Sequence, residues 1–299
     1  MNMPIRTLPS STSVPPQAPI TRDFQHEALK LGLQLYSRVS RDGAARLVER
    51  LAFTPQRLPM PSRYEYLLDE ADSHTQLHHG AHILPVYSWG EGPTVLGVHG
   101  WSGAGIQFGA YVKPLVKAGY RVVLFDAPAH GRAQGEQTDL YEMTEVLMRV
   151  GQQFGPIHGI IAHSLGCIAA GRALVDGLPA RHLVMLAPPA TLSDVVNGLG
   201  AQLGLTDSAL AEHRRRMEHR FGSHVWDRLA LEDLVPRLMQ QGLVVIDSDD
   251  TSVPEAQSAR VYHNWPDAGL LRTRDLGHYR MLSHPTVVEP VIEYLTSNA

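Results

Sequence analysis

The chain of 299 residues is 43% hydrophobic and 19% charged, with a formal net charge of -4. These values are typical of a globular protein with a sizeable core, and the near-neutral balance argues against a nucleic-acid partner. No apolar run reaches the roughly 18 residues that a membrane span needs, and a single cysteine, Cys167, excludes an intramolecular disulfide or a cysteine zinc cluster.

The first 20 residues are rich in Pro and Ser and lack the apolar core of a secretory signal. They predict a flexible leader, and a cytoplasmic location is the default expectation. Residues 21–60 predict an N-terminal helical segment, because apolar residues recur there as a loose stripe. Gly43 is expected to divide it into two helices. Extended stretches are expected around residues 64–68 and 83–89, with turn-prone polar sequence between them.

Short apolar runs then recur along the chain and alternate with helix-like segments. Most of the runs are rich in Val, Ile or Leu without alternation, as expected for strands covered on both faces. The predicted strands are residues 94–98, 121–125, 159–162, 182–186, 243–246 and 270–273. The predicted helices are residues 107–118, 140–153, 167–176 and, at the end, 287–295. This alternation predicts a parallel sheet with helices on both sides.

Between residues 186 and 243 there is far more chain than one crossover helix requires. Residues 192–205 and 208–229 are helix-like, so we predict a helical cap over residues 190–238. The rest of the globular part, residues 61–189 and 239–299, is predicted to form one α/β core.

In a parallel sheet of this kind, ligands bind outside the carboxyl ends of the strands. The segments just after five of the predicted strands are rich in chemically active residues. In chain order they are GVHGW, FDAPAHG, AHSLG, DDTSVP and LGHYRML. Serine, carboxylate and histidine therefore follow strands in that order.

With these motifs, residues 83–295 resemble the α/β-hydrolase superfamily of serine hydrolases, in which the chain order is also Ser, Asp, His. The resemblance implies an α/β-hydrolase fold, with a mostly parallel central sheet flanked by helices and a helical cap insertion. Ser164 would be the nucleophile, at a sharp turn from strand to helix. Gly166 is the expected small residue after it, whereas Ala162 stands where the usual pattern has glycine.

The resemblance also implies the partners of this serine. A serine hydroxyl needs an adjacent base, and His278 is the candidate because it follows the last strand in Leu-Gly-His. A carboxylate would orient His278 and stabilise the imidazolium. Asp250 fits the family's pattern, since it is followed by two residues and then Val-Pro, and Asp249 is the alternative.

The backbone N–H groups of Leu165 and Trp101 are expected to form the oxyanion hole of such an enzyme. The Trp101 side chain, together with His99 and His163, is a candidate for contact with the substrate, although the indole could equally pack there without such contact. His99, His130 and His163 are expected to fix their loops or line the pocket and not to act in catalysis directly. Cys167 is expected to be a small apolar filler of the following helix. The cap sequence AEHRRRMEHRFGSH is basic, which indicates either attraction of an anionic substrate or a solvated helix face.

The sequence thus predicts a serine hydrolase that cleaves a small carboxylic ester or thioester, without cofactor, metal or membrane span. Two alternatives remain. The same triad supports C–C bond hydrolysis, lactone opening or perhydrolysis. A small-molecule binding protein on a hydrolase scaffold is the alternative outside enzymes. The sequence does not predict the substrate or the oligomeric state.

Overall fold

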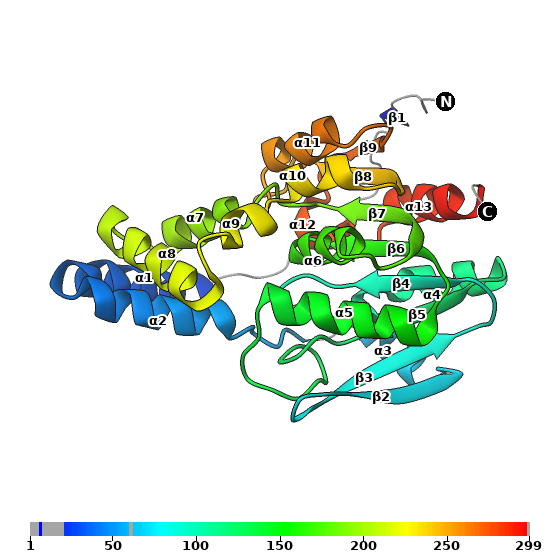
Figure 1. Cartoon of the computed structure of the whole chain (residues 1–299), viewed down its shortest axis with the longest axis horizontal. Coiled ribbons are helices and arrows are strands. Elements are labelled where there is room, and N and C mark those ends of the chain that lie inside the picture. Colours follow the sequence, from blue (N-terminus) through cyan, green and yellow to red (C-terminus); the bar gives the residue numbers. More distant parts are fainter. Residues whose placement is uncertain (1–5, 8–20, 60–61, 298–299) are drawn as a thin grey trace.

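A computed structural model describes residues 6–7, 21–59 and 62–297 of the chain. These residues form one sheet of nine strands, in the order β1-β9-β8-β7-β6-β4-β5-β3-β2, with helices packed around it (Figure 1). The strands are β1 (Arg6–Thr7), β2 (Ser73–His79), β3 (His82–Trp89), β4 (Thr94–Val98), β5 (Arg121–Phe125), β6 (Ile157–His163), β7 (Ala180–Leu186), β8 (Gln241–Asp247) and β9 (Gly269–Thr273).

The central strands β4 to β9 pair in parallel, and β3 and β2 add an antiparallel edge. Every residue of β4 and β6 is buried, which explains their continuous apolar sequence. The chain places β5 on one side of β4 and β6 on the other. The carboxyl ends of β4 and β6 therefore flank the point where the strand order reverses, where open α/β sheets bind their ligands.

Helices cover both faces of this sheet. On one face α5 (Leu140–Phe154), α6 (Leu165–Val175), α10 (Leu231–Leu234) and α11 (Glu255–Asn264) pack together. The other face carries α3 (Ser62–Asp69), the 3-10 turn η1 (Gly105–Phe108), α4 (Gly109–Lys117), α12 (Gly277–Arg280) and α13 (Pro285–Ser297). The predicted α/β-hydrolase fold class is confirmed.

A separate group of helices extends beyond one end of the sheet (Figure 1). It consists of α1 (Thr21–Val39), α2 (Arg41–Phe53), α7 (Leu192–Gln202), α8 (Asp207–Phe221) and α9 (Val225–Arg228), and the chain returns to the sheet through η2 (Val235–Arg237). We call α1, α2, α7, α8 and α9 the cover. Leu33, Val48 and Leu203 form a small buried cluster between α1, α2 and the end of α7.

Two expectations for residues 61–82 are wrong. Residues 64–68 are not extended but belong to α3, because Leu67 and Leu68 are buried on one side of a helix. The polar segment after them contains strand β2, which the sequence does not indicate. Burial alternates along β2, an edge strand with one partner, β3, but Leu77 is the only apolar residue on its less exposed face, so the sequence shows no apolar alternation.

The N-terminal helices divide at Ser40 and not at Gly43. Ser40 caps α2 by accepting a hydrogen bond from the Gly43 N–H at 3.1 Å. Gly43 lies inside α2, where a Cβ atom would approach the Tyr36 hydroxyl to 2.2 Å. The glycine is therefore explained by close packing of α2 against α1.

Most of the predicted flexible leader, residues 1–20, lies outside the described residues. Its residues Arg6 and Thr7 pair in parallel with β9. None of the helices in the described part of the chain is long and apolar enough to span a membrane. The boundaries that divide the chain into leader, helical segment, core and cap remain predictions.

Candidate active site

Ser164 stands between β6 and α6 in a backbone conformation that few residues adopt, with φ 53° and ψ -126°. This turn directs the side chain away from both elements. Its N–H donates to the Leu186 carbonyl of the neighbouring strand at 3.0 Å. A Cβ atom on Gly166 would approach the Val98 carbonyl to 2.5 Å, so only glycine fits two residues after the serine. Ala162 is fully buried in β6, where its methyl group is accommodated.

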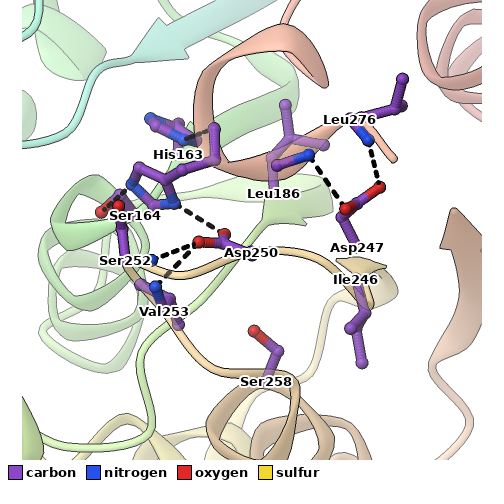
Figure 2. A network of polar contacts seen from close by, with 12 residues as sticks. His163, Ser164, Leu186, Ile246, Asp247, Asp250, Ser252, Val253, Ser258 and Leu276 are labelled. Carbon is purple, nitrogen blue, oxygen red and sulfur yellow. Dashed lines mark hydrogen bonds and ion pairs between the residues drawn. The ribbon is translucent and has the colours of Figure 1, made fainter. Parts of the chain in front are cut away.

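His278 and Asp250 lie beside this serine. The Nε2 atom of His278 is 3.0 Å from the Ser164 hydroxyl, and its Nδ1 atom is 2.7 Å from Asp250 Oδ2. The second oxygen of Asp250 accepts the N–H groups of Ser252 and Val253, at 2.8 and 2.9 Å (Figure 2). With the Nδ1 proton held by the carboxylate, Nε2 is free to accept the serine proton.

The other two aspartates of this loop have different partners. Asp249 is exposed and accepts the Asp275 N–H at 2.9 Å, so it does not meet His278. Asp247 is 1% exposed and accepts the Thr273 hydroxyl at 2.8 Å and the Gly277 N–H at 2.9 Å. It also accepts the Leu276 N–H, as Figure 2 shows. Asp247 therefore fixes the loop that carries His278.

The loop after β4 closely approaches the serine. A Cβ atom on Gly100 would lie 2.8 Å from the Ser164 Cβ and 3.0 Å from the His163 carbonyl. Trp101 follows Gly100 at this point. Leu165 is the first residue of α6, and the N–H groups of a first helical turn have no acceptor within the helix. Both predicted oxyanion residues thus flank Ser164 in the structure.

A cavity of about 580 Å³ opens onto this group of residues. Ser164, Leu165, His278 and Trp101 belong to its wall. The rest of the wall is largely apolar and comes from both the core and the cover. It includes Leu51, Phe53, Leu140, Val195, Val196, Leu199, Met217, Phe221, Val225, Leu229 and Val253. Among the described residues, no group of three or more His, Cys, Asp or Glu side chains is arranged to hold a metal ion.

Comparison with known proteins decides the family. The model of the alpha/beta hydrolase family matches residues 95–291, about two thirds of the chain. The chain belongs to the alpha/beta hydrolase family. It is thus a hydrolase, and the resemblance to the α/β-hydrolase superfamily that its sequence motifs indicate is confirmed. No curated protein gives a significant match to the hydrolase.

Solved structures with low sequence identity share the fold. VinJ is 15% identical with a TM-score of 0.60, and the match covers 77% of this chain and all of VinJ. The thioesterase domain from the curacin biosynthetic pathway is 16% identical with a TM-score of 0.56, covering 75% of this chain and 99% of that domain. A monoacylglycerol lipase from Paleococcus ferrophilus is 20% identical with a TM-score of 0.57, covering 72% and 99%.

Only one of the three residues predicted to contact the substrate lines the cavity. Trp101 lines it, whereas His99 and His163 do not. His99 receives the Ala127 N–H at 3.0 Å on Nε2 and donates from Nδ1 to the Gly100 carbonyl at 2.8 Å. His163 donates to the backbone carbonyl of His278 at 2.9 Å, and the two rings lie 4.5 Å apart. Both side chains fix loops of the site instead of lining the cavity.

These loop histidines are held neutral. Burial lowers the pKa of His99, although Asp126 opposes the shift. Burial also lowers the pKa of His163 well below its usual value, and His278 adds to the effect. His130, whose ring contacts those of His99 and Trp101, has its pKa lowered by burial to about 3.

The basic segment of the cover is largely paired. Arg216 contacts Glu49 and Asp42, Arg215 contacts Glu212, and Arg220 contacts Asp139. This pairing favours the solvated-face alternative over attraction of an anionic substrate.

Cys167 is fully buried in α6, and burial raises the pKa of its thiol well above the usual value. It is not a competing nucleophile.

Sequence reasoning missed most of the cavity wall, including Leu51, Phe53 and His213. In the sequence, Leu51 and Phe53 belong to an apolar stripe of a predicted helix. Such a stripe does not show whether its residues line a cavity or pack in a core. His213 belongs to the basic segment but is 1% exposed. In the part of the chain that the structure describes, neither of its ring nitrogens has a hydrogen-bond partner. Burial lowers its pKa.

Proposed function

We propose that this hydrolase cleaves carboxylic esters or thioesters through an acyl-enzyme on Ser164. The observation that carries the proposal is the chain of contacts from Ser164 Oγ to His278 Nε2 at 3.0 Å, and from Nδ1 to Asp250 at 2.7 Å. A serine hydroxyl becomes an effective nucleophile when a positioned base accepts its proton.

In the first step, Ser164 Oγ attacks the carbonyl carbon while His278 Nε2 takes the hydroxyl proton. The tetrahedral intermediate collapses, the C–O or C–S bond breaks, and His278 returns the proton to the leaving alcohol or thiol. Water then attacks the acyl-enzyme while His278 takes its proton; the bond between the acyl carbon and Ser164 Oγ breaks, His278 returns the proton to Oγ, and the acid is released. Asp250 remains ionised throughout and stabilises the imidazolium.

The negative oxygen of the intermediate would be held by the backbone N–H groups of Leu165 and Trp101. The close approach of Gly100 to Ser164 supports this role, because it brings the following peptide to the reacting atoms. Such preorganised donors act where charge develops and are typically worth about 3–4 kcal/mol each. The N-terminal position of Leu165 in α6 favours the same negative charge.

The cavity indicates the kind of substrate. Its largely apolar wall and volume of about 580 Å³ suit an ester with a sizeable apolar acyl or alcohol group. The fold neighbours include a thioesterase domain, an N-acyl homoserine lactone degrading enzyme and a monoacylglycerol lipase. Because these share only the fold, they support acyl transfer as a class and do not select the bond.

Pre-steady-state hydrolysis of p-nitrophenyl esters of graded acyl length tests the proposal. We expect a burst of p-nitrophenol of about one equivalent per Ser164, followed by slower turnover. The Ser164→Ala variant should show neither. A matching thioester series distinguishes the two bond types. A folded protein that gives no burst and no turnover with any ester or thioester, yet binds such compounds, would favour the binding-protein alternative.

A further inference from the structure

The N-terminal helices contribute directly to the cavity, although they precede the region that the family model matches, residues 95–291. Leu51, Ala52 and Phe53, at the end of α2, belong to the cavity wall together with Ser164 and His278. Figure 1 shows α2 beside α8, beyond the sheet. The cover is thus built from two parts of the chain that are far apart in sequence.

The end of α2 packs against the inserted cap helix α8 at the cavity. The rings of Phe53 and Phe221 lie 5.7 Å apart and are tilted by 58°, and both line the cavity. The guanidinium of Arg220 lies 4.4 Å from the centre of the Phe53 ring. One turn earlier, Glu49 pairs with Arg216 at 2.7 Å. Phe53 is therefore held in place by α8 on its outer side.

The segment after α2 is tied to the core beside the catalytic loops. The Phe53 carbonyl accepts the Thr138 N–H at 3.0 Å. The Gln56 N–H donates at 2.9 Å to the hydroxyl of Ser102, which follows Trp101 in the loop after β4. Arg57 donates to three backbone carbonyls, those of Gly131, Ala133 and Gly135, at 2.7 to 3.0 Å. These contacts fix the end of α2 relative to Ser164.

We propose that Leu51 and Phe53 are specificity-determining residues, which limit the length of the apolar chain that the substrate carries. The inference rests on the proposed function for the bond cleaved, but it concerns the wall of the same cavity. A fixed apolar wall accepts chains that reach it and excludes longer ones. One methylene group too many or too few in such a pocket typically changes kcat/KM by about tenfold or more.

Leu51 offers a test with a matched control. Leu47 lies one turn earlier on α2 and is equally exposed, at 38%, but it is not part of the cavity wall. Leu51→Trp should fill the cavity rim, whereas Leu47→Trp should not. Two ester series are measured for each variant: p-nitrophenyl alkanoates of increasing acyl length, and acetate esters of alcohols of increasing length.

In one of the two series, Leu51→Trp is expected to lower the ratio of kcat/KM for long over short chains by about tenfold or more. The Leu47→Trp variant should keep the wild-type ratio. The series that responds identifies whether the acyl or the alcohol chain reaches α2. Equal profiles for wild type and both variants in both series would overturn the inference.

Phe53→Leu tests the same wall in the opposite direction, because a smaller buried side chain enlarges the cavity and should extend the accepted length. Phe53→Leu is preferred to Phe53→Ala because Phe53 is only 6% exposed and full truncation risks unfolding.

If the wild-type protein hydrolyses no ester at all, the proposed function fails on its own. Calorimetric binding of alkanoic acids of graded length to Leu51→Trp and Leu47→Trp then decides the inference separately, with equal length profiles overturning it.

Discussion

The two sides of the cavity are built in different ways. On the side of the sheet, the polar groups of the catalytic loops are buried and bonded to the backbone: Asp250 accepts two N–H groups, and Asp247 accepts three more. On the side of the cover, the wall is largely apolar, although Asp194 of α7 and His213 of α8 also belong to it, and the pair of Arg216 with Glu49 lies outside it. The difference separates chemistry, which needs fixed polar atoms, from recognition, which needs a shaped apolar surface.

The same contrast appears in two glycines, one beside Ser164 and one in the cavity wall. Gly100, beside Ser164, has no room for a Cβ atom, whereas Gly198 of α7 has no neighbour within 4 Å of that position. The backbone beside the reacting serine is thus closely packed, whereas this part of the cover leaves space beside its backbone. Substitutions on the two sides should accordingly affect activity to very different degrees.

The largest difference is expected between two adjacent carboxylates of the core. Asp250→Asn should lower kcat by on the order of 10⁴-fold, because the amide no longer fixes the tautomer of His278. Asp249→Asn retains a side-chain oxygen for the Asp275 N–H and should change kcat by less than about threefold. Steady-state kinetics on one good ester compares them. A larger loss in Asp249→Asn than in Asp250→Asn would mean that the acid is misassigned.

A smaller but still strong effect is expected for Gly100→Ala. Its methyl group would displace the loop from Ser164, and kcat/KM should fall by roughly 10² to 10³-fold, as when one oxyanion donor is lost. The control is Gly32→Ala in α1 of the cover, which is exposed, is not part of the cavity wall and has no neighbour within 4 Å of a Cβ position; it should leave the kinetics near wild type. Circular dichroism verifies that both variants fold. Wild-type kinetics in folded Gly100→Ala would argue against the oxyanion role of this loop.

Mild acid should lower the unfolding free energy of the core at a pH that is still too high to protonate ordinary carboxylates. His99, His130 and His163 have lowered pKa values because they are buried and neutral, His130 to about 3. The unfolded chain binds protons below about pH 6.5, while these folded-state groups do not. Their stabilising effect is therefore complete above pH 6.5 and is lost as the pH falls toward their folded-state values. Each contributes a slope of at most about 1.4 kcal/mol per pH unit. Denaturant unfolding between pH 7 and 5 measures this slope. An unfolding free energy that does not change with pH in this range would contradict the prediction.

The smallest effect is expected in the cover at His213. Its ring nitrogens lack a hydrogen-bond partner among the described residues, and burying such a group costs about 1–3 kcal/mol. His213→Leu removes that penalty at similar size, so we expect the unfolding free energy to rise by about 1 kcal/mol. Urea unfolding at pH 7.5 checks this. Destabilisation by more than 1 kcal/mol would reveal a bonded partner that stabilises the imidazole.

What could be predicted from the sequence follows the same division. Ser164, Asp250 and His278 can be predicted because each lies in a segment that follows a strand, within five residues of its end, and parallel strands bring their carboxyl ends to one rim. The edge strand β2 is missed because one partner and an exposed face leave it polar. The helix α3 is mistaken for a strand because its four apolar and aromatic residues form a short run whose spacing fits a strand as well as a helix.

The contribution of α2 to the cavity has no signal in a single sequence. An apolar residue such as Phe53 has the same spacing whether it contacts a core or a ligand. Its meaning depends on long-range packing, here against Phe221 across 168 positions of chain. The loop histidines show the same limit, since His99 and His163 are adjacent to site residues in sequence but point behind the cavity wall.

The most direct measurement is the labelling of the purified protein by a fluorophosphonate, with the modified residue mapped by mass spectrometry. An activated serine in contact with His278 should be labelled at Ser164 alone. Labelling should be lost in Ser164→Ala and strongly slowed in His278→Ala, while Asp249→Asn reacts at the wild-type rate. A folded wild-type protein that remains unlabelled at Ser164 would contradict the assignment of Ser164 as the nucleophile.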